Sequence, residues 1–302
     1  MKKYLLPALL MAATTAFAAD SQSGTGETDG FKLVWQDLFD FGTLNPDRWN
    51  IEVNGSGGGN NELQYYTDRT ENVRVGDDGK GNGCLILTAR REDYNNRNFT
   101  SGRINSKTKV AFTHGKIEAS IKIPTTANGL WPAFWMMGND YDQVGWPRCG
   151  ETDIMEMGHG DGIAAGTHDR LFNGALHWAN ADGSHAQYAG VSTNSYNIQD
   201  GEFHLFTLIW DESEIRMYLD LDRNPSAEPY LTMKVSEGEL ASQFHKPGFI
   251  LFNLAVGGDF PGIHDADGVT ALNDGNSQSQ SMFVNYVKVY EKTSEMTLNS
   301  EK

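Results

Sequence analysis

The local fold and the chemistry of this chain can be read from one segment, Cys149-Gly-Glu-Thr-Asp-Ile-Met-Glu-Met157. Acidic residues alternate there with apolar or β-branched ones, which is the period of a β-strand with two different faces. Glu151 and Asp153 share one face of a regular strand, and Glu156 points to the other. One extra residue, a β-bulge at 154–155, returns Glu156 to the face of the other two acids.

The three carboxyls allow three interpretations. An acidic strand at the surface alternates in the same way, because one of its faces meets solvent. Carboxylates also bind Ca²⁺ or Mg²⁺. In the third interpretation, crowding raises the pKa of at least one carboxyl, so that one group stays protonated as an acid while another is ionised as a nucleophile. Paired carboxyls about 5 Å apart are the arrangement of a retaining glycosidase.

Short strand-like runs separated by Gly, Asn and Asp continue this pattern over residues 31–290. In 116–123 the odd positions are apolar and most even positions are polar, which predicts one buried face. Long helical periodicity is missing, and 237–244 is a candidate for one short helix. Many short strands with turns between them indicate an all-β sandwich or jelly roll. The predicted strands are 31–36, 84–90, 115–123, 133–137, 151–157, 174–178, 204–210, 215–219, 249–256 and 282–290.

Composition excludes several classes of partner. The 40 acidic and 24 basic side chains give a formal charge of −16. Phosphate binding needs clustered Lys and Arg, so we expect no nucleic-acid partner and no docking on an anionic membrane. No apolar run approaches the ~18 residues of a membrane span, so we expect no membrane insertion. The 33 glycines and the 11% aromatic content suit an all-β protein with many turns and an aromatic surface.

The two ends differ in composition from the rest of the chain. A basic start, a short apolar run and small residues near Ala18 are typical of a secretory signal peptide. We therefore expect a secreted or periplasmic protein whose mature chain starts near Ala19 or Asp20. The expected division is a signal peptide at 1–19, a flexible leader at 20–30, one domain at 31–291 and a polar tail at 292–302. Cys84 and Cys149 could pair in an oxidising compartment or remain buried thiols, and the sequence leaves both alternatives open.

The segment Gly150-Glu-Thr-Asp-Ile-Met-Glu156 closely resembles the active-site strand of glycoside hydrolase family 16 in its bulged form. Within the family the chain is most similar to the bacterial laminarinases, which are endo-acting β-1,3-glucanases. Lichenases and xyloglucan enzymes lack the bulge, whereas agarases and carrageenases share it, so the bulge alone does not fix the substrate. Further segments agree in order, namely 34–40 (VWQDLFD), 60–67 (NNELQYYT), 101–104 (SGRI), 129–138 (GLWPAFWMMG), 175–178 (ALHW), 204–210 (HLFTLIW) and 253–258 (NLAVGG).

The resemblance implies an antiparallel two-sheet β-jelly-roll sandwich with a concave substrate cleft. It also implies Glu151 as nucleophile, Glu156 as general acid/base and Asp153 between them, tuning both. A glycosyl-enzyme then forms and is hydrolysed with net retention. The chain departs from the family at Thr152, where Ile is more usual. Because this side chain faces the core, we expect some lost apolar burial and no change of mechanism.

A neutral glucan needs aromatic platforms and polar partners. The resemblance assigns the family's cleft tryptophans to Trp131 and Trp135, although a Trp in a β protein is otherwise most often a core residue. It assigns further substrate contacts to Asn61, Glu62, Arg103, Trp146, His177 and Asn253. A turn-forming Asn, a solvated Arg and a hydrogen-bonded structural His are the alternatives for such residues.

No cofactor is expected for catalysis. His159, Asp161, His168 and Asp169 crowd one Gly-rich loop, but no tight ligand spacing connects them, which favours a solvated loop. Family members often carry a structural Ca²⁺ on the convex face, and the nearest positions here are Leu38, Gly83 and Asn285. The usual Asp is replaced by Asn285, and the lost charge weakens such a site.

Together these features predict a secreted, monomeric, retaining endo-glycosidase whose partner is a neutral polysaccharide, β-1,3-glucan of the laminarin type. Three alternatives remain: the same mechanism on mixed-linkage β-glucan or agarose, a non-catalytic glucan-binding lectin, and a metal-dependent hydrolase. A pure binder has no need of the clustered carboxyls Glu151 and Glu156. The negative charge weighs against sulfated polymers, which would prefer a basic cleft.

Overall fold

The computed structural model of the chain describes residues 27–28, 30–40, 42–273, 275 and 277–293. The expected signal peptide at 1–19 lies outside these residues, as do most of the expected leader and tail. Strand β1 (Glu27–Thr28) pairs with β2 (Phe31–Asp37), so strand structure begins within the segment expected to be a flexible leader.

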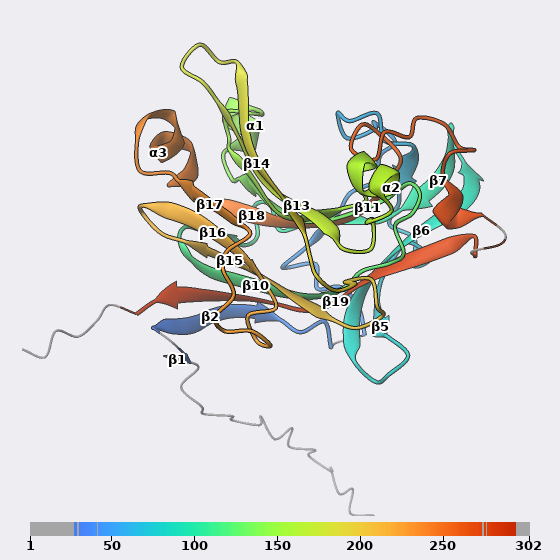
Figure 1. Ribbon diagram of the computed structural model, residues 1–302, viewed down its shortest axis with the longest axis horizontal. Helices are drawn as coiled ribbons and strands as arrows, with labels where there is room; N and C mark the ends of the chain where they lie inside the picture. Colours follow the sequence, from blue (N-terminus) through green and yellow to red (C-terminus); the bar gives the residue numbers. More distant parts are fainter. Residues whose placement is uncertain (1–26, 29, 41, 274, 276, 294–302) are drawn as a thin grey trace, which may run out of the picture.

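The described residues form two sheets, which lie one above the other in Figure 1. All pairings but one are antiparallel, since β4 and β7 run parallel. The smaller sheet has the order β14 (His185–Thr193), β13 (Leu171–Ala179), β12 (Glu151–Met157), β11 (Leu130–Gly138), β18 (Gly248–Val256), β8 (Arg103–Asn105) and β3 (Asn50–Ile51), with β9 (Ala111–Phe112) on β18.

The larger sheet contains two strands from opposite ends of the described region, β2 and β19, side by side. Its order is β17 (Leu231–Lys234), β16 (Glu214–Leu219), β15 (His204–Trp210), β10 (Gly115–Lys122), β19 (Ser279–Lys292), β6 (Gly83–Tyr94), β7 (Arg97–Ser101) and β4 (Gln64–Tyr66). Strand β2 also pairs with β19, and β5 (Val73–Asp77) pairs with β6. The predicted antiparallel two-sheet β-sandwich is therefore confirmed.

The core lies between the two sheets, where the alternation of each strand places its apolar side chains. The alternation noted in 116–123 is confirmed, because Ile117, Ala119 and Ile121 are all buried. From the smaller sheet, Phe134 and Phe252 stack on each other with ring centroids 4.9 Å apart. Burial of such large rings is a main source of the free energy that holds the sheets together.

The helices are short, and none in the described part of the chain is long and apolar enough to cross a membrane. They are α1 (Tyr141–Val144), α2 (Gly160–Ala165), α3 (Gly238–Phe244) and the 3₁₀ turn η1 (Thr270–Leu272). The helix predicted at 237–244 is α3. Figure 1 shows α1 and α2 on the outer side of the smaller sheet.

Candidate active site

The three acids of β12 share one face of the smaller sheet because the strand contains the expected bulge. Glu151 pairs with His177, Asp153 with Ala175, and Glu156 with Asn173. The partners on β13 are two residues apart each time, so they lie on one face, and the register shift between Asp153 and Glu156 brings Glu156 onto it. We call this outer side of the smaller sheet, defined by Glu151, Asp153 and Glu156, the carboxyl face.

Two glycines fix where the acidic strand begins and ends. Gly150 has φ of +76° before β12, and Gly158 has φ of +96° after it. A Cβ at Gly150 would lie 3.0 Å from the Gln243 carbonyl oxygen, and one at Gly158 would overlap that of Leu130. Since only glycine combines this conformation with such close approach, these positions hold β12 in place between α3 and the start of β11.

Burial dominates the electrostatics of the carboxyl face. It raises the pKa of Glu151 to about 8 and that of Asp153 to about 8, and it raises the pKa of Glu156 well above its ordinary value. The charge of Asp153 raises the pKa of both glutamates further. His177, Arg103 and a hydrogen bond from Trp146 oppose this at Glu151. Burial therefore favours the protonated form of all three carboxyls, and Glu151 is the glutamate at which His177 and Arg103 oppose this shift.

Trp131 contacts the carboxyl face through its ring nitrogen. Its Nε1–H donates to Oε1 of Glu156 at 3.0 Å, and its ring stacks on Phe260 with centroids 4.7 Å apart and planes 9° apart. His159 meets the Phe260 ring edge-on. Only 9% of Trp131 is exposed, so most of the ring orients Glu156 and packs on Phe260 instead of offering an open platform.

Trp135 is held in a second group of side chains on the same face. Its Nε1–H donates to Oδ1 of Asn253 at 2.8 Å, and the Arg103 guanidinium lies 4.8 Å from the ring centre. Nε of Arg103 in turn lies 3.0 Å from Oε1 of Glu52. Trp135 is 9% exposed. The structure thus places in one group three residues that were predicted separately as substrate contacts, namely Trp135, Arg103 and Asn253.

His177 lies at the other end of the acid row, beside Glu151. Its Nε2 is 3.2 Å from Oδ2 of Asp153 and 3.9 Å from Oε1 of Glu151. Trp146, in the loop after α1, is 45% exposed, and its ring centre is 6.2 Å from that of His177. Trp146 and His177 therefore lie together at the Glu151 end of the carboxyl face.

Asn61 and Glu62 follow a Gly-rich loop and are arranged differently from each other. Asn61 is exposed, and its Nδ2 donates to both carboxylate oxygens of Asp259 at 3.0 and 3.1 Å. Glu62 is only 4% exposed, and its Oε2 accepts hydrogen bonds from Gln64 and Tyr66. Glu62, which was expected to contact substrate, is thus buried and hydrogen-bonded to its neighbours, whereas Asn61 is exposed.

The sequence did not single out four residues that the structure places in these groups, namely Glu52, His185, Asp259 and Phe260. Asp259 and Phe260 directly follow the family segment 253–258, so an aromatic residue in that Gly-rich stretch was the available signal. Glu52 and His185 carry no local signal, because their roles depend on strand pairing over long sequence distances.

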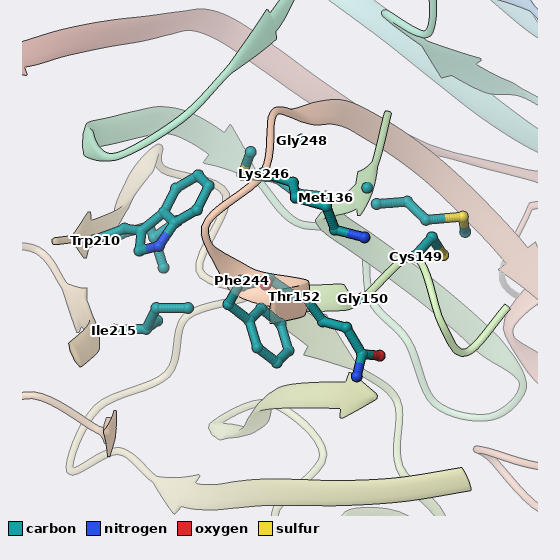
Figure 2. A pocket seen from close by; sticks show the side chains of 13 residues that line it. Met136, Cys149, Gly150, Thr152, Trp210, Ile215, Phe244, Lys246 and Gly248 are labelled. Atoms are coloured by element: carbon teal, nitrogen blue, oxygen red, sulfur yellow. The ribbon is translucent and has the colours of Figure 1, made fainter. Parts of the chain in front are cut away.

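Thr152 lies on the opposite side of β12 from the carboxyls, as expected. It lines a cavity of about 20 Å³ between the acidic strand and α3, and Figure 2 shows Cys149, Trp210 and Phe244 around it. This is the lost apolar burial expected from Thr in place of Ile. Cys149 and Cys84 are both buried free thiols, and burial raises the pKa of each to about 12. Of the two alternatives for the cysteines, the structure therefore has the unpaired one.

The positions suggested for a structural calcium do not fit the ion as they are arranged. Asn285 on β19 points its Nδ2–H at the Gly83 carbonyl at 2.9 Å, so it presents a donor where the ion needs an oxygen. The hydrogen bond itself joins β19 to the start of β6. Leu38 lies just after β2 and is 37% exposed.

Within the described residues, the group with metal-ligand geometry is Glu151, Asp153 and His177, whose ligand atoms lie within 4.8 Å of one another. The cluster of His and Asp noted after Glu156 is dispersed. His159 accepts a hydrogen bond from the Asp161 backbone at the start of α2, and Asp169 pairs with Arg170. Part of the segment expected to be a solvated loop is therefore helical.

Comparison with known proteins gives a consistent result. The family model of glycosyl hydrolases family 16 matches residues 60–235. A glucan endo-1,3-beta-glucosidase of Cryptopygus antarcticus is 36% identical over 85% of this chain and 90% of its own length. The clotting factor G alpha subunit of Tachypleus tridentatus is 33% identical over 87% of this chain, which spans about a third of that protein (34%).

Among solved structures, a family 16 enzyme from the mixed linkage glucan PUL of Bacteroides ovatus, solved with a G4G4G3G product, has a TM-score of 0.74. It is 40% identical in sequence, and the match covers 84% of this chain and 99% of that one.

Proposed function

The chain belongs to glycosyl hydrolase family 16 and is a glycoside hydrolase, and from this premise we propose that it is a retaining endo-glucanase that cleaves β-1,3-glucan. The observation that carries the proposal is the bulged strand β12, which places Glu151, Asp153 and Glu156 on one face. A bulge that returns a third acid to this face serves no packing purpose, since three buried carboxyls cost stability.

In the proposed mechanism Glu156 donates its proton to the leaving glycosidic oxygen while Glu151 attacks the anomeric carbon. Burial keeps Glu156 protonated, and the Trp131 Nε1–H fixes the orientation of its carboxyl. His177 and Arg103 favour the ionised form of Glu151. After the leaving group departs, the sugar is bonded to Glu151. The Glu156 carboxylate then takes a proton from a water whose oxygen attacks the anomeric carbon, and the bond to Glu151 breaks, which releases the sugar with net retention.

We further propose that the sugar chain crosses the carboxyl face from the Trp146 side to the Asn61 side. Exposed Trp146 offers the apolar surface that stacks on a sugar ring. Trp135 and the amide of Asn253 supply an aromatic edge and a hydrogen-bonding group beyond the acids. Binding along the sheet, and not in a closed pocket, suits cleavage inside a polymer. The proposed substrate is neutral, in line with the overall charge of −16.

Mixed-linkage β-glucan is the second candidate substrate. The Bacteroides ovatus enzyme named for that glucan is 40% identical to this chain, against 36% for the Cryptopygus glucan endo-1,3-beta-glucosidase. Both polymers are made of glucose and contain β-1,3 linkages, so the reaction at the three carboxyls is the same for both. The difference lies in whether the neighbouring sugars are joined by β-1,3 or β-1,4 bonds.

A substrate panel tests the proposal. Reducing-sugar release is measured on laminarin, barley mixed-linkage glucan and agarose with the wild-type protein and with Glu151→Gln. Glu118→Gln serves as the matched control, because Glu118 is a similarly buried acid on β10 in the other sheet. We expect cleavage of laminarin by wild type and control and none by Glu151→Gln. Binding of laminarin without cleavage of any polymer would favour a lectin, and cleavage of barley glucan alone would favour the second candidate.

Export of the protein is proposed on the sequence alone. The basic, apolar and small-residue regions at 1–19 indicate cleavage near Ala19. N-terminal sequencing of the protein recovered from the periplasm or the medium of expressing cells should begin at Ala19 or Asp20, whereas an intact Met1 start would contradict export. Size-exclusion chromatography with light scattering checks the proposed monomer.

A further inference from the structure

The bulge of the acidic strand takes one residue out of the hydrogen-bonding ladder. Around the bulge, the residues of β12 that pair with β13 are Asp153 and Glu156, and those that pair with β11 are Asp153, Met155 and Glu156. Ile154 therefore has no partner in the described register of either neighbouring strand, and it is fully buried. A buried carbonyl needs a hydrogen-bond donor, so the bulge requires one from outside the sheet.

The donor is the hydroxyl of Tyr230, which comes from the opposite sheet. Tyr230 immediately precedes β17, and its backbone N–H donates to the carbonyl of Met217 on β16 at 2.9 Å. Its hydroxyl donates to the Ile154 carbonyl. Burial raises the pKa of Tyr230, so the hydroxyl keeps the proton that it donates. A side chain anchored beside the larger sheet thus satisfies the carbonyl that the bulge leaves without a strand partner.

The chain leaves room for this contact at Gly174 on β13. Gly174 lies opposite the bulge, between the two residues of β13 that pair with Asp153 and Glu156. A Cβ on Gly174 would lie 3.0 Å from Cε2 of Tyr230. The Tyr230 ring also packs edge-on against Phe172, with centroids 4.9 Å apart and planes 83° apart. The ring is therefore fixed where its hydroxyl reaches the bulge.

The place of the bulge in the strand decides which acid depends on it. Glu151 and Asp153 come before the bulge and pair with β13 in a regular register. Glu156 comes after the bulge, and the extra residue is what puts its carboxyl on the carboxyl face. Loss of the donor would leave a buried carbonyl unsatisfied, and the backbone at 154–155 would have to move to recover a hydrogen bond. Such a movement displaces Glu156 and leaves Glu151 in place.

We propose that Tyr230 is a positioning residue that holds the bulge through the Ile154 carbonyl and so keeps Glu156 aligned with the leaving glycosidic oxygen. The proposal rests on the proposed mechanism, in which Glu156 is the general acid. Tyr230 packs against the core between the sheets and acts only through the backbone of β12. A shift of about 1 Å at a catalytic group lowers a rate by up to roughly a hundredfold, so a single hydroxyl on the core side has a measurable effect on turnover.

Tyr230→Phe tests this, because it keeps the ring against Phe172 and removes only the hydroxyl. The matched control is Tyr196→Phe. Tyr196 lines the same cavity of about 660 Å³ as Tyr230, and its hydroxyl donates to Oδ2 of Asp220 at 2.7 Å, a bond that does not involve the acidic strand. Two substrates are compared by kcat/KM. A glucan needs Glu156 to protonate its leaving oxygen, whereas a dinitrophenyl β-laminaribioside releases a stable phenolate that needs no proton.

In Tyr230→Phe we expect kcat/KM on laminarin to fall by at least about tenfold, while kcat/KM on the dinitrophenyl glycoside stays within about twofold of wild type. A change that only loosened the fold would lower both values. Tyr196→Phe should match wild type on both substrates. If wild type cleaves barley glucan alone, that polymer replaces laminarin. An equal fall on the two substrates, no fall on the polymer, or the same selective fall in Tyr196→Phe would overturn the role of Tyr230.

A second readout does not depend on activity. Hydrogen–deuterium exchange followed by mass spectrometry reports how tightly the amides of β12 are held. In Tyr230→Phe we expect exchange in 151–157 to become about tenfold faster than in wild type and in Tyr196→Phe. Unchanged exchange in this strand would contradict the statement that Tyr230 holds the bulge. Faster exchange in Tyr230→Phe together with a wild type that cleaves no glucan would refute the proposed function alone.

Discussion

Replacing Glu151 by glutamine should stabilise the protein at neutral pH while it abolishes turnover. Burial raises the pKa of Glu151 from 4.5 to about 8. A carboxyl with a raised pKa holds its proton more tightly in the folded state. The folded state is therefore unpenalised at low pH and loses stability as the pH rises from the unfolded pKa to the folded one. Glutamine has the same shape and no charge to bury.

The size of the stability penalty follows from the difference between the pKa of Glu151 in the unfolded and in the folded state. Each pH unit between them costs about 1.4 kcal/mol, so the penalty on the wild type reaches about 3 kcal/mol at pH 7 and vanishes near pH 4. For a domain of this length, at about 2 °C per kcal/mol, that corresponds to a rise in Tm of about 6 °C in Glu151→Gln at pH 7.

The assay is thermal unfolding followed by circular dichroism at pH 4 and pH 7. The control is Glu118→Gln, which removes a carboxyl that pairs with Lys116 at 2.8 Å and should lower Tm slightly at pH 7. Two results would refute the reasoning that burial of this carboxyl lowers the free energy of unfolding. One is a lower Tm for Glu151→Gln than for wild type at pH 7. The other is an increase in Tm at pH 4 as large as the increase at pH 7.

Three further predictions concern other parts of the molecule. Trp131→Phe removes the hydrogen bond that lowers the pKa of Glu156, so the alkaline limb of the pH profile of kcat should move to higher pH by about one unit. An unchanged alkaline limb would show that this hydrogen bond does not affect Glu156. Thr152→Ile fills the cavity beside α3 and should stabilise the protein by about 1 kcal/mol without moving the pH profile; a lower Tm in thermal unfolding would show that the space is too small. EDTA should leave Tm and activity unchanged, because Asn285 already bonds to the Gly83 carbonyl; a fall in Tm that calcium restores would reverse this assignment.

Much of the fold follows from residue alternation. The strands expected at 151–157 and 204–210 have the predicted bounds, and most others differ by a few residues at their ends. Strand β14 was missed because its alternating residues are small and polar, so no apolar face marks it. The two-residue strand β3 and the three-residue strand β8 are too short for any period to be recognised.

The candidate site likewise contains some features that could be predicted from the sequence and others that could not. The bulge at 154–155 could be predicted, because without it Glu156 would point into the apolar core. The covering of Trp131 by Phe260 and the pairing of His177 with His185 could not, since both depend on how distant segments meet in the folded chain. The inward turn of Glu62 likewise depends on Gln64 and Tyr66, which the pattern gave no reason to single out.

The stereochemistry of the first product tests the central claim most directly, because it reports how Glu151 and Glu156 act. Proton NMR during hydrolysis of laminarin by the wild-type enzyme resolves the anomeric signals before mutarotation mixes them. The double-displacement mechanism predicts that the β-anomer appears first and the α-anomer follows only slowly. An α-anomer formed first would mean direct attack by water, and it would contradict the assignment of Glu151 as the nucleophile.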